Sequence, residues 1–245
     1  MKTFINLNNL PKHISIIMDG NGGWANQKGI SRIFGHHHSL KSTESIINGC
    51  VKLKIPYLTL YAFSKENWKR SEMEVKYIIK LIVRTIKNNL KNFINNNIKL
   101  TIIGDIKNFS IEYQNEINFA INISKNNNKL NLIILINYSG RWEITEAIKL
   151  ICNDIKNNIL NLNNINNKTF LKYLFTNKIP NPDLLIRTGG EARVSNFFLW
   201  QIAYTEIFIT KVSWPNFRKK DFHKAILNFQ KRKRKFGLVK KESVS

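Results

Sequence analysis

The first candidate for chemistry is an acidic residue at the end of an apolar run. HISIIM (13–18) is followed by Asp19 and then by GNGG over 20–23. A strand that ends in a carboxylate and continues into residues with small side chains exposes backbone N–H groups to a phosphate, and the carboxylate beside them can bind a divalent cation. An ordinary Gly/Asn turn has the same composition. This stretch alone therefore leaves both interpretations open.

Arg32 and His36 follow this stretch within one short segment. Both can donate hydrogen bonds to diphosphate oxygens, and arginine can do so with two N–H groups at once. The three consecutive histidines over 36–38 also suggest metal binding. No second cluster of His or Cys accompanies them, so a structural zinc site is not supported. One phosphate-binding histidine is the better interpretation.

A pair of arginines lies in LIRTGGEARVSNF (185–197), where Arg187 and Arg193 flank two glycines. Two guanidinium groups beside open backbone predict a second diphosphate site.

Two further segments leave alternatives open. SKENWKR (64–70) combines several polar residues with a tryptophan, which a functional site or an exposed helix N-terminus would explain equally well. Glu206 stands in an apolar segment, where an unpaired carboxylate is costly, so we expect a metal or an arginine partner for it.

The elements that must position these residues can be predicted from hydrophobic patterning. Short, β-branched apolar runs predict strands over 13–18, 57–63, 99–104, 130–138 and 183–190. Helical spacing predicts helices over about 40–53, 71–93, 111–125, 142–158, 168–175 and 221–235, and Ser71 with Glu74 fits a capping box. This alternation predicts a single α/β domain over 1–245 with a mostly parallel central sheet flanked by helices. Ligands of such sheets bind beyond the carboxyl ends of the strands.

The charge of the chain calls for an anionic partner. Lys and Arg number 39 against 16 acidic residues, which gives a net charge of +23. Nucleic acid, a membrane surface or a phosphorylated substrate would all suit this charge. The two cysteines, Cys50 and Cys152, support neither a disulfide framework nor a thiolate zinc site, and they fit a cytoplasmic location. The apolar runs are too short to span a bilayer, so any membrane contact is expected to be peripheral.

Six stretches together resemble a known family. They are HISIIMDGNGGWA, RIFGH, LYAFSKENWKR, NYSGRWEI, IRTGGEARVSNFFLWQIAYTEI and WPNF. In this order, over about 13–236, they are similar to the signature blocks of the cis-prenyltransferases, in particular bacterial undecaprenyl diphosphate synthases. The resemblance implies a magnesium-dependent, homodimeric enzyme with an apolar tunnel between sheet and helices. Its activity would be repeated cis addition of isopentenyl diphosphate to farnesyl diphosphate, which yields a long polyprenyl diphosphate lipid carrier for cell-wall synthesis.

The resemblance also implies roles for individual residues. Asp19 matches the aspartate associated with magnesium and diphosphate departure, Glu206 matches the second magnesium carboxylate, and Asn67 matches the proton acceptor. The matched substrate-binding positions are Gly20, Asn21, Gly22, Gly23, Trp24, Arg32 and His36 on the allylic side, Ser64, Lys65, Glu66, Trp68 and Arg70 around Asn67, and Arg187, Arg193, Val194 and Ser195 at the isopentenyl clamp. An amide is a poor base, so the proton can instead pass to diphosphate or to a water through Asn67.

The chain departs from the family pattern at one site position and leaves alternatives open. The family usually has GNGRW where this chain has GNGGW, so Gly23 replaces an arginine that assists the allylic diphosphate, and Lys28 is a candidate to compensate. Ser39 and Leu40 stand where smaller residues are common, which leaves the product length open. Gly23 would also suit a non-catalytic relative. The net charge and the basic tail at about 231–245 would suit a nucleic-acid or membrane-surface binder, but no known RNA-binding pattern accompanies the charge, so no nucleic acid is expected.

Overall fold

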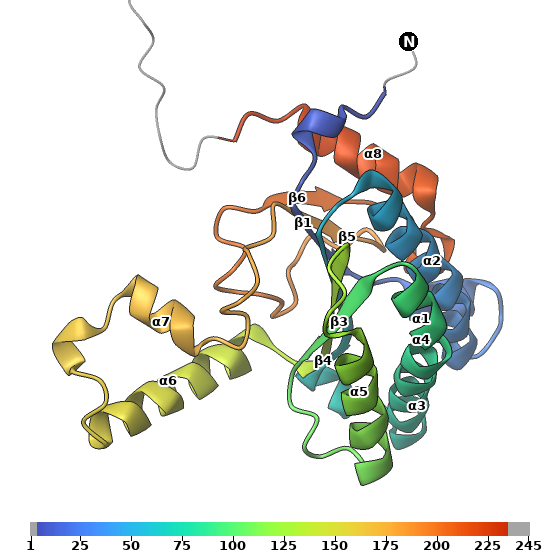
Figure 1. The fold of residues 1–245 in the computed structure, drawn as a ribbon. Coiled ribbons are helices and arrows are strands. Elements are labelled where there is room, and N and C mark those ends of the chain that lie inside the picture. The colour runs from blue at the N-terminus through green and yellow to red at the C-terminus, as the bar shows by residue number, and fades with distance from the viewer. Residues whose placement is uncertain (1–3, 235–245) are drawn as a thin grey trace, which may run out of the picture.

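Six parallel strands form one sheet in the structure, a computed structural model that describes residues 4–234 (Figure 1). The strands are β1 (His13–Ile17), β2 (Tyr57–Ser64), β3 (Ile98–Ile103), β4 (Leu130–Tyr138), β5 (Leu184–Arg187) and β6 (Glu206–Ile209). Their order across the sheet is β3-β4-β2-β1-β5-β6. The predicted fold class is therefore confirmed.

The strand register determines which residues meet at the carboxyl edge of the sheet. Ile17 at the end of β1 lies beside Tyr61 of β2 on one side and beside Arg187 of β5 on the other. Asp19 follows Ile17 directly, and β2 continues to Ser64. Three segments that are far apart in the sequence thus end at neighbouring points of one edge, where a parallel sheet places its ligand site.

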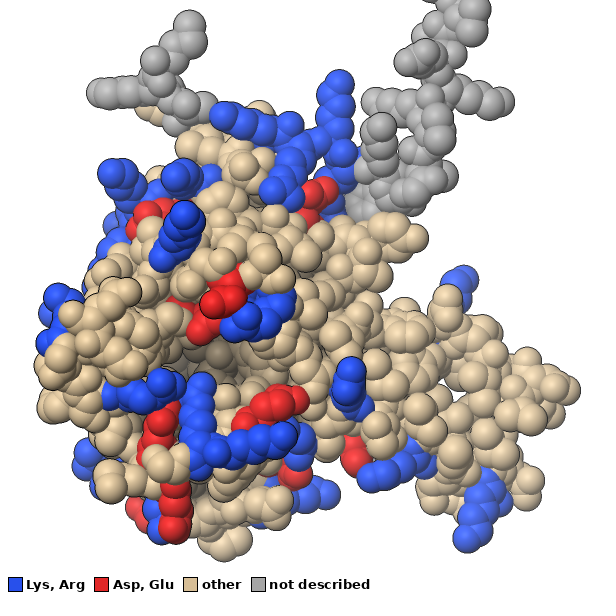
Figure 2. Space-filling model, turned by 180° about the vertical axis from the view of Figure 1, so that it is seen from behind, with Lys and Arg blue, Asp and Glu red and all other residues tan. Residues whose placement is uncertain are grey.

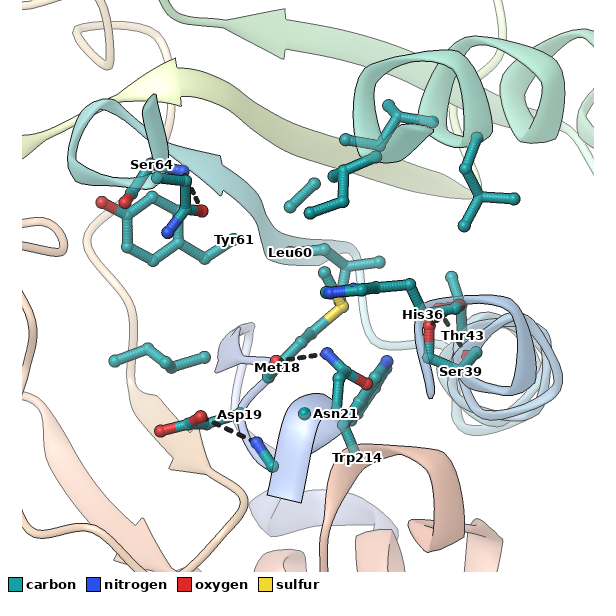
Figure 3. A pocket seen from close by; sticks show the side chains of 18 of the residues that line it. Met18, Asp19, Asn21, His36, Ser39, Thr43, Leu60, Tyr61, Ser64 and Trp214 are labelled. Carbon is teal, nitrogen blue, oxygen red and sulfur yellow. Dashed lines mark hydrogen bonds between the residues drawn. The ribbon is translucent and has the colours of Figure 1, made fainter. Parts of the chain in front are cut away.

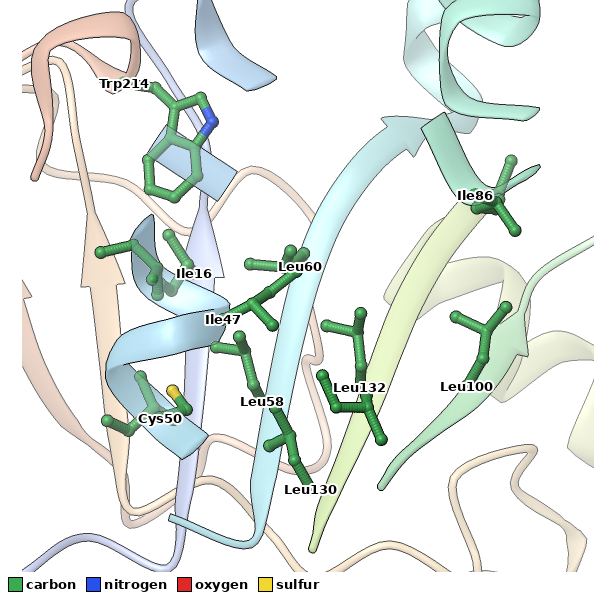
Figure 4. Close-up of a cluster of buried hydrophobic side chains, with 14 of the residues drawn as sticks. Ile16, Ile47, Cys50, Leu58, Leu60, Ile86, Leu100, Leu130, Leu132 and Trp214 are labelled. Atoms are coloured by element: carbon green, nitrogen blue, oxygen red, sulfur yellow. The ribbon is translucent and has the colours of Figure 1, made fainter. Parts of the chain in front are cut away.

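The central strands β1, β2, β4 and β5 are apolar on both faces because both faces are buried. Alternate side chains such as Ile16 and Leu132 enter a core beneath the helices, which Figure 4 shows, while Ile17 and Ile133 enter a second core on the opposite face. The helices that bury residues in the first core are α2 (Arg32–Leu53), α3 (Glu72–Asn88), α4 (Leu90–Asn95), α5 (Ile111–Ser124) and α8 (Lys219–Gln230). Continuous apolar runs, without the alternation of a half-exposed sheet, are the expected result.

Two helices lie apart from this layer. α6 (Gly140–Lys156) and α7 (Asn167–Tyr173) extend away from the sheet as an arm, drawn in yellow-green and orange in Figure 1. The remaining elements are α1 (Asn21–Gln27) and the 3-10 turns η1 (Leu7–Asn9), η2 (Lys65–Lys69), η3 (Leu162–Asn164) and η4 (Trp214–Asn216). No helix within residues 4–234 has the length and apolar character needed to cross a membrane.

Several element boundaries differ from the predicted ones. The glycine-rich stretch, which resembles a turn, forms the first turn of α1, and α2 begins at Arg32 instead of near residue 40. The predicted helix over 71–93 is divided at Asn89 into α3 and α4. β6 was not predicted because it is a short edge strand whose side chains are only partly buried.

Candidate active site

A cavity of about 390 Å³ opens beyond the carboxyl ends of β1, β2 and β5 (Figure 3). Its polar lining contains most of the predicted site residues. These are Asp19, Gly20, Asn21, Gly22, Gly23, Arg32, His36, Ser64, Asn67, Arg70, Arg187, Arg193 and Ser195. Figure 2 shows a hollow in the face of the molecule that is bordered by both basic and acidic side chains. The structure thus brings both predicted diphosphate sites to one cavity.

Arg187 connects the two predicted diphosphate sites. Its Nη2 donates to Oδ2 of Asp19 at 2.6 Å, and its Nη1 donates to Oγ of Ser195 at 2.8 Å and to the carbonyl oxygen of Arg193. The Arg187 side chain is 4% exposed, whereas that of Asp19 is 36% exposed. Asp19 also accepts from the Gly20 N–H through Oδ1 at 2.7 Å. A buried guanidinium with these partners is held in one orientation.

Two glycines of the loop after β1 leave room for neighbouring groups. Gly20 has φ +98°, and an added Cβ would lie 2.9 Å from Cβ of Ser213. At Gly22 an added Cβ would lie 2.6 Å from Cζ of Arg32, so the glycine leaves room for this guanidinium. The first intrahelical hydrogen bond of α1 runs from the Trp24 N–H to the Gly20 carbonyl at 3.0 Å. The N–H groups between these residues therefore have no helical partner and can bind an anion.

A carboxylate lies behind the cationic wall of the cavity. Glu74 accepts from Nη1 of Arg70 at 2.9 Å, and its oxygens lie 3.5 Å from Nε of Arg32 and 3.5 Å from Nε2 of His36. Burial, together with the neighbouring Arg70 charge, lowers the pKa of His36 to about 4. His36 is therefore neutral near pH 7, and a ring N–H is the group that it can offer to an anion. Our sequence reasoning did not assign Glu74 to the site.

The carboxamide of Asn67 has a defined orientation. Its Oδ1 accepts from the Ser64 backbone N–H at 3.0 Å in a capping box that begins η2. A backbone N–H can only donate, so the oxygen of the amide must face it and the NH₂ group is the free end. Asn67 thus presents a donor to the cavity.

Three neighbours of Asn67 hold η2 in place and are not among the lining residues. Lys65 pairs with Asp105 at 3.2 Å, and Trp68 donates to Oδ1 of Asn137 at 2.8 Å. Glu66 accepts from Nδ2 of Asn196 at 2.6 Å. Residue 196 directly follows the predicted isopentenyl diphosphate site at 193–195, so this last contact connects η2 to that site.

Two other predicted substrate-binding residues lie outside the lining. Trp24 is 7% exposed and donates through Nε1 to Oδ1 of Asn216 at 3.0 Å. The ammonium of Lys28 lies 5.2 Å from the centroid of the Trp24 ring and is also outside the lining, so its role in place of the missing arginine stays a prediction. Val194 packs against the second core.

The structure does not bring Glu206 to Asp19 within one chain. Glu206 begins β6 and lies beside Leu184, whereas Asp19 follows the other end of its strand. The strands are parallel, so these carboxylates lie at opposite edges of the sheet. Glu206 is paired with Arg232 at 2.8 Å, and no cluster of three or more potential metal ligands occurs within residues 4–234. The arginine partner expected for Glu206 is therefore present, and its role as a second magnesium carboxylate stays a prediction.

The inner end of the cavity is apolar. It lies between the sheet and the helices, as predicted for the tunnel, and α3 supplies much of the wall. The apolar lining residues from these elements are Leu40, Leu60, Ile78, Leu81, Ile82, Ile86 and Ile134. A cavity with two predicted anion sites at its mouth and an apolar end suits an enzyme that joins molecules with anionic heads and apolar tails.

Comparison with known proteins defines the family. The family model described as "Putative undecaprenyl diphosphate synthase" matches residues 17–237, and the chain belongs to this family of cis-prenyltransferases. It is 45% identical to ditrans,polycis-undecaprenyl-diphosphate synthase ((2E,6E)-farnesyl-diphosphate specific) of Pasteurella multocida, over 94% of this chain and 96% of the relative. It is 44% identical to isoprenyl transferase of Clostridium perfringens, over 94% and 91% of the two chains.

Solved structures agree with this assignment. Lavandulyl diphosphate synthase from Lavandula x intermedia, in complex with dimethylallyl diphosphate, superimposes with a TM-score of 0.90 at 34% identity, over 93% of this chain and 98% of the other. A probable undecaprenyl diphosphate synthase from Campylobacter jejuni superimposes with a TM-score of 0.77 at 30% identity, over 94% and 99%. The resemblance seen in the sequence is confirmed.

Proposed function

We propose that the protein condenses isopentenyl diphosphate repeatedly, with cis geometry, onto farnesyl diphosphate and so makes a long-chain polyprenyl diphosphate carrier lipid for cell-wall synthesis. The observation that carries this proposal is the shared cavity, in which Arg187 contacts both Asp19 and Ser195. The apolar end of the same cavity offers a place for the growing chain. The family assignment supports the same reaction.

The allylic diphosphate binds to the N–H groups at the start of α1, with Arg32 and His36 as further donors. Arg187, Arg193 and Ser195 bind the diphosphate of isopentenyl diphosphate. When the allylic C–O bond breaks, negative charge grows on the leaving diphosphate, and donors fixed in advance stabilise that charge without reorganisation. The double bond of isopentenyl diphosphate then forms the new C–C bond, and loss of a proton restores neutrality.

Magnesium fits this cavity through Asp19. Asp19 is the acidic residue of the lining, and magnesium in proteins is commonly held by one or two carboxylates together with substrate phosphates. When bound, the ion supplies positive charge to the leaving diphosphate. Arg187 fixes one oxygen of this carboxylate, Oδ2, through a hydrogen bond of 2.6 Å.

We assign Asn67 as a hydrogen-bond donor to a substrate phosphate. Its oxygen is occupied by the Ser64 N–H, and the free NH₂ group cannot take up a proton. The proton lost in each condensation therefore passes to an oxygen of the leaving diphosphate, which is a stronger base than an amide. This assignment replaces the proton-acceptor role that the resemblance implies.

A second copy of the chain is the proposed partner of the projecting arm. The arm exposes large apolar side chains that an isolated chain leaves in water. They are Ile148, Leu150, Ile159, Leu162 and Phe175, with exposures of 49%, 45%, 71%, 67% and 47%. A homodimer would bury them, and light scattering of the purified protein measures its mass directly.

We infer a cytoplasmic enzyme with peripheral contact to anionic lipid, because the chain carries a net charge of +23 and its product is a lipid. Two arginines of the basic tail form ion pairs with acidic residues of the folded domain. Arg232 pairs with Glu206 at 2.8 Å and Arg234 pairs with Asp183 at 2.5 Å, while 235–245 lies outside the described residues. Salt-sensitive binding to acidic vesicles but not to RNA would support this contact.

Incubation of the purified protein with labelled isopentenyl diphosphate, farnesyl diphosphate and magnesium tests the proposed reaction. We expect long polyprenyl products. Absence of product at every enzyme concentration would favour the non-catalytic alternative and overturn the proposal.

A further inference from the structure

Glu74 uses its side chain for something other than the capping role that its position predicts. Ser71 Oγ accepts from the Glu74 backbone N–H at 3.4 Å, so half of the predicted capping box is present. Within the described residues, the Glu74 carboxylate makes its contacts with Arg32, His36 and Arg70. The helix start is therefore capped by the Ser71 hydroxyl, which accepts from the Glu74 backbone N–H, and the Glu74 carboxylate contacts other residues.

The carboxylate stands one layer behind the cavity. Arg32, His36 and Arg70 all line the cavity, whereas Glu74 does not, and its side chain is only 11% exposed. It engages Nε of Arg32 and one Nη of Arg70, which leaves the remaining N–H groups of both guanidinium forks available to a ligand. Figure 3 shows His36 extending from α2 into the same space.

The charge balance of the cavity gives this carboxylate a second effect. The lining holds four arginines and one carboxylate, and Asp19 is already paired with Arg187. Among the ion pairs of the described residues, Glu74 is the partner of both Arg32 and Arg70. A buried charge is screened far less than an exposed one, so Glu74 substantially reduces the positive potential that a diphosphate meets on this side.

We propose that Glu74 is a positioning residue that orients Arg32 and Arg70 and offsets their charge, so that the cavity holds diphosphate reversibly. This inference rests on the proposed function. Each condensation breaks the allylic C–O bond, forms one C–C bond, releases a proton and leaves one inorganic diphosphate in the cavity. That diphosphate must depart before the next cycle. A site with two unbalanced guanidinium groups would retain it.

Calorimetric titration with inorganic diphosphate and magnesium tests the sign of this effect. Glu74→Gln keeps the shape and a carbonyl acceptor for Arg70 but removes the charge. We expect it to bind diphosphate about tenfold more tightly than the wild type, which corresponds to about 1.4 kcal/mol, and to have a lower kcat because release is slower. Glu72→Gln is the matched control, since Glu72 lies on the same helix and pairs with Lys76 at the surface. It should leave both quantities unchanged.

The conservative variant Glu74→Asp retains the charge and should bind diphosphate as the wild type does. A purely structural role for Glu74 predicts the opposite sign, because misplaced arginines bind diphosphate less well. Unchanged or weaker binding in Glu74→Gln would therefore overturn the inference. If Glu74→Gln does not fold, Glu74→Asn carries the same test, since both keep the backbone N–H that Ser71 caps. Failure of the wild type to bind diphosphate in competition with farnesyl diphosphate would instead overturn the proposed function.

Discussion

Substitution of Gly23 by arginine restores the residue that the family usually has and tests how the first anion site works. An added Cβ at Gly23 has no heavy atom within 4 Å, and the backbone there is not in the left-handed region, in contrast to Gly20. Gly23 lines the cavity and lies in the first turn of α1. An arginine can therefore be accommodated without backbone change, with its guanidinium at the cavity mouth.

The magnitude follows from exposure. A hydrogen bond to a charged group contributes about 1.5–3 kcal/mol when it is desolvated, and exposed ion pairs contribute about 1 kcal/mol or less. Gly23 is exposed, so the lower range applies. We expect Gly23→Arg to strengthen allylic diphosphate binding by about 1 kcal/mol, which lowers the KM for farnesyl diphosphate roughly fivefold.

Steady-state kinetics at saturating isopentenyl diphosphate, together with product-length analysis, measures this change. Asn26→Arg is the matched control, because residue 26 is an exposed position of the same helix outside the cavity lining. It adds the same charge and should leave KM nearly unchanged. An unchanged or higher KM in Gly23→Arg would refute our reading of this loop. An equal fall in both variants would show that only the overall charge matters.

Three further predictions concern buried or oriented groups. Arg187→Lys cannot reproduce the contacts with both Asp19 and Ser195, so we expect kcat/KM to fall at least about 100-fold, as for loss of a buried bidentate pair. A kcat/KM within tenfold of the wild type would contradict the role of Arg187 in connecting the two diphosphate sites. Asn67→Asp keeps the acceptor for the Ser64 N–H but replaces the NH₂ donor by an oxygen, so the KM for isopentenyl diphosphate should rise. A gain in kcat with rising pH would instead indicate that residue 67 acts as a base. Burial lowers the pKa of His13 to about 4, below its unfolded value of 6.5, so the unfolded chain binds the extra proton and the free energy of unfolding falls by about 3 kcal/mol as the pH drops from 6.5 to 4. Urea unfolding at pH 7 and at pH 4.5 should show this loss, and the loss should be smaller in His13→Gln. An equal loss in both proteins would exclude His13 as its cause.

The sequence predicts elements best where burial is uniform. β1, β2 and β4 are apolar on both faces because each is covered by a core on both sides, so their runs stand out. The first turns of α2, with the sequence RIFGHHHS, lie at the polar mouth of the cavity and lack a helical apolar stripe. β6 alternates between partly buried and exposed side chains at the edge of the sheet. These are the elements whose bounds or existence local patterning could not indicate.

The residues of the site also differ in whether the sequence could predict them. Arg187 and Asp19 could be predicted because each follows or ends a recognisable strand, and the parallel topology brings strand ends together. Glu74 was interpreted only as a helix cap. Its partners come from α2 and from the turn before α3, and only the tertiary fold brings these segments to Glu74. The position of Glu206 relative to Asp19 could not be predicted, because the direction of an unpredicted strand decides the edge at which its first residue lies.

The most direct test of the shared cavity is a crystal structure with magnesium, isopentenyl diphosphate and a non-reactive thio analogue of farnesyl diphosphate. We expect one diphosphate on the N–H groups at the start of α1 and Arg32, the other on Arg187, Arg193 and Ser195, and the farnesyl tail against α3. Two diphosphates in separate pockets, or a tail outside the space between sheet and α3, would contradict the account.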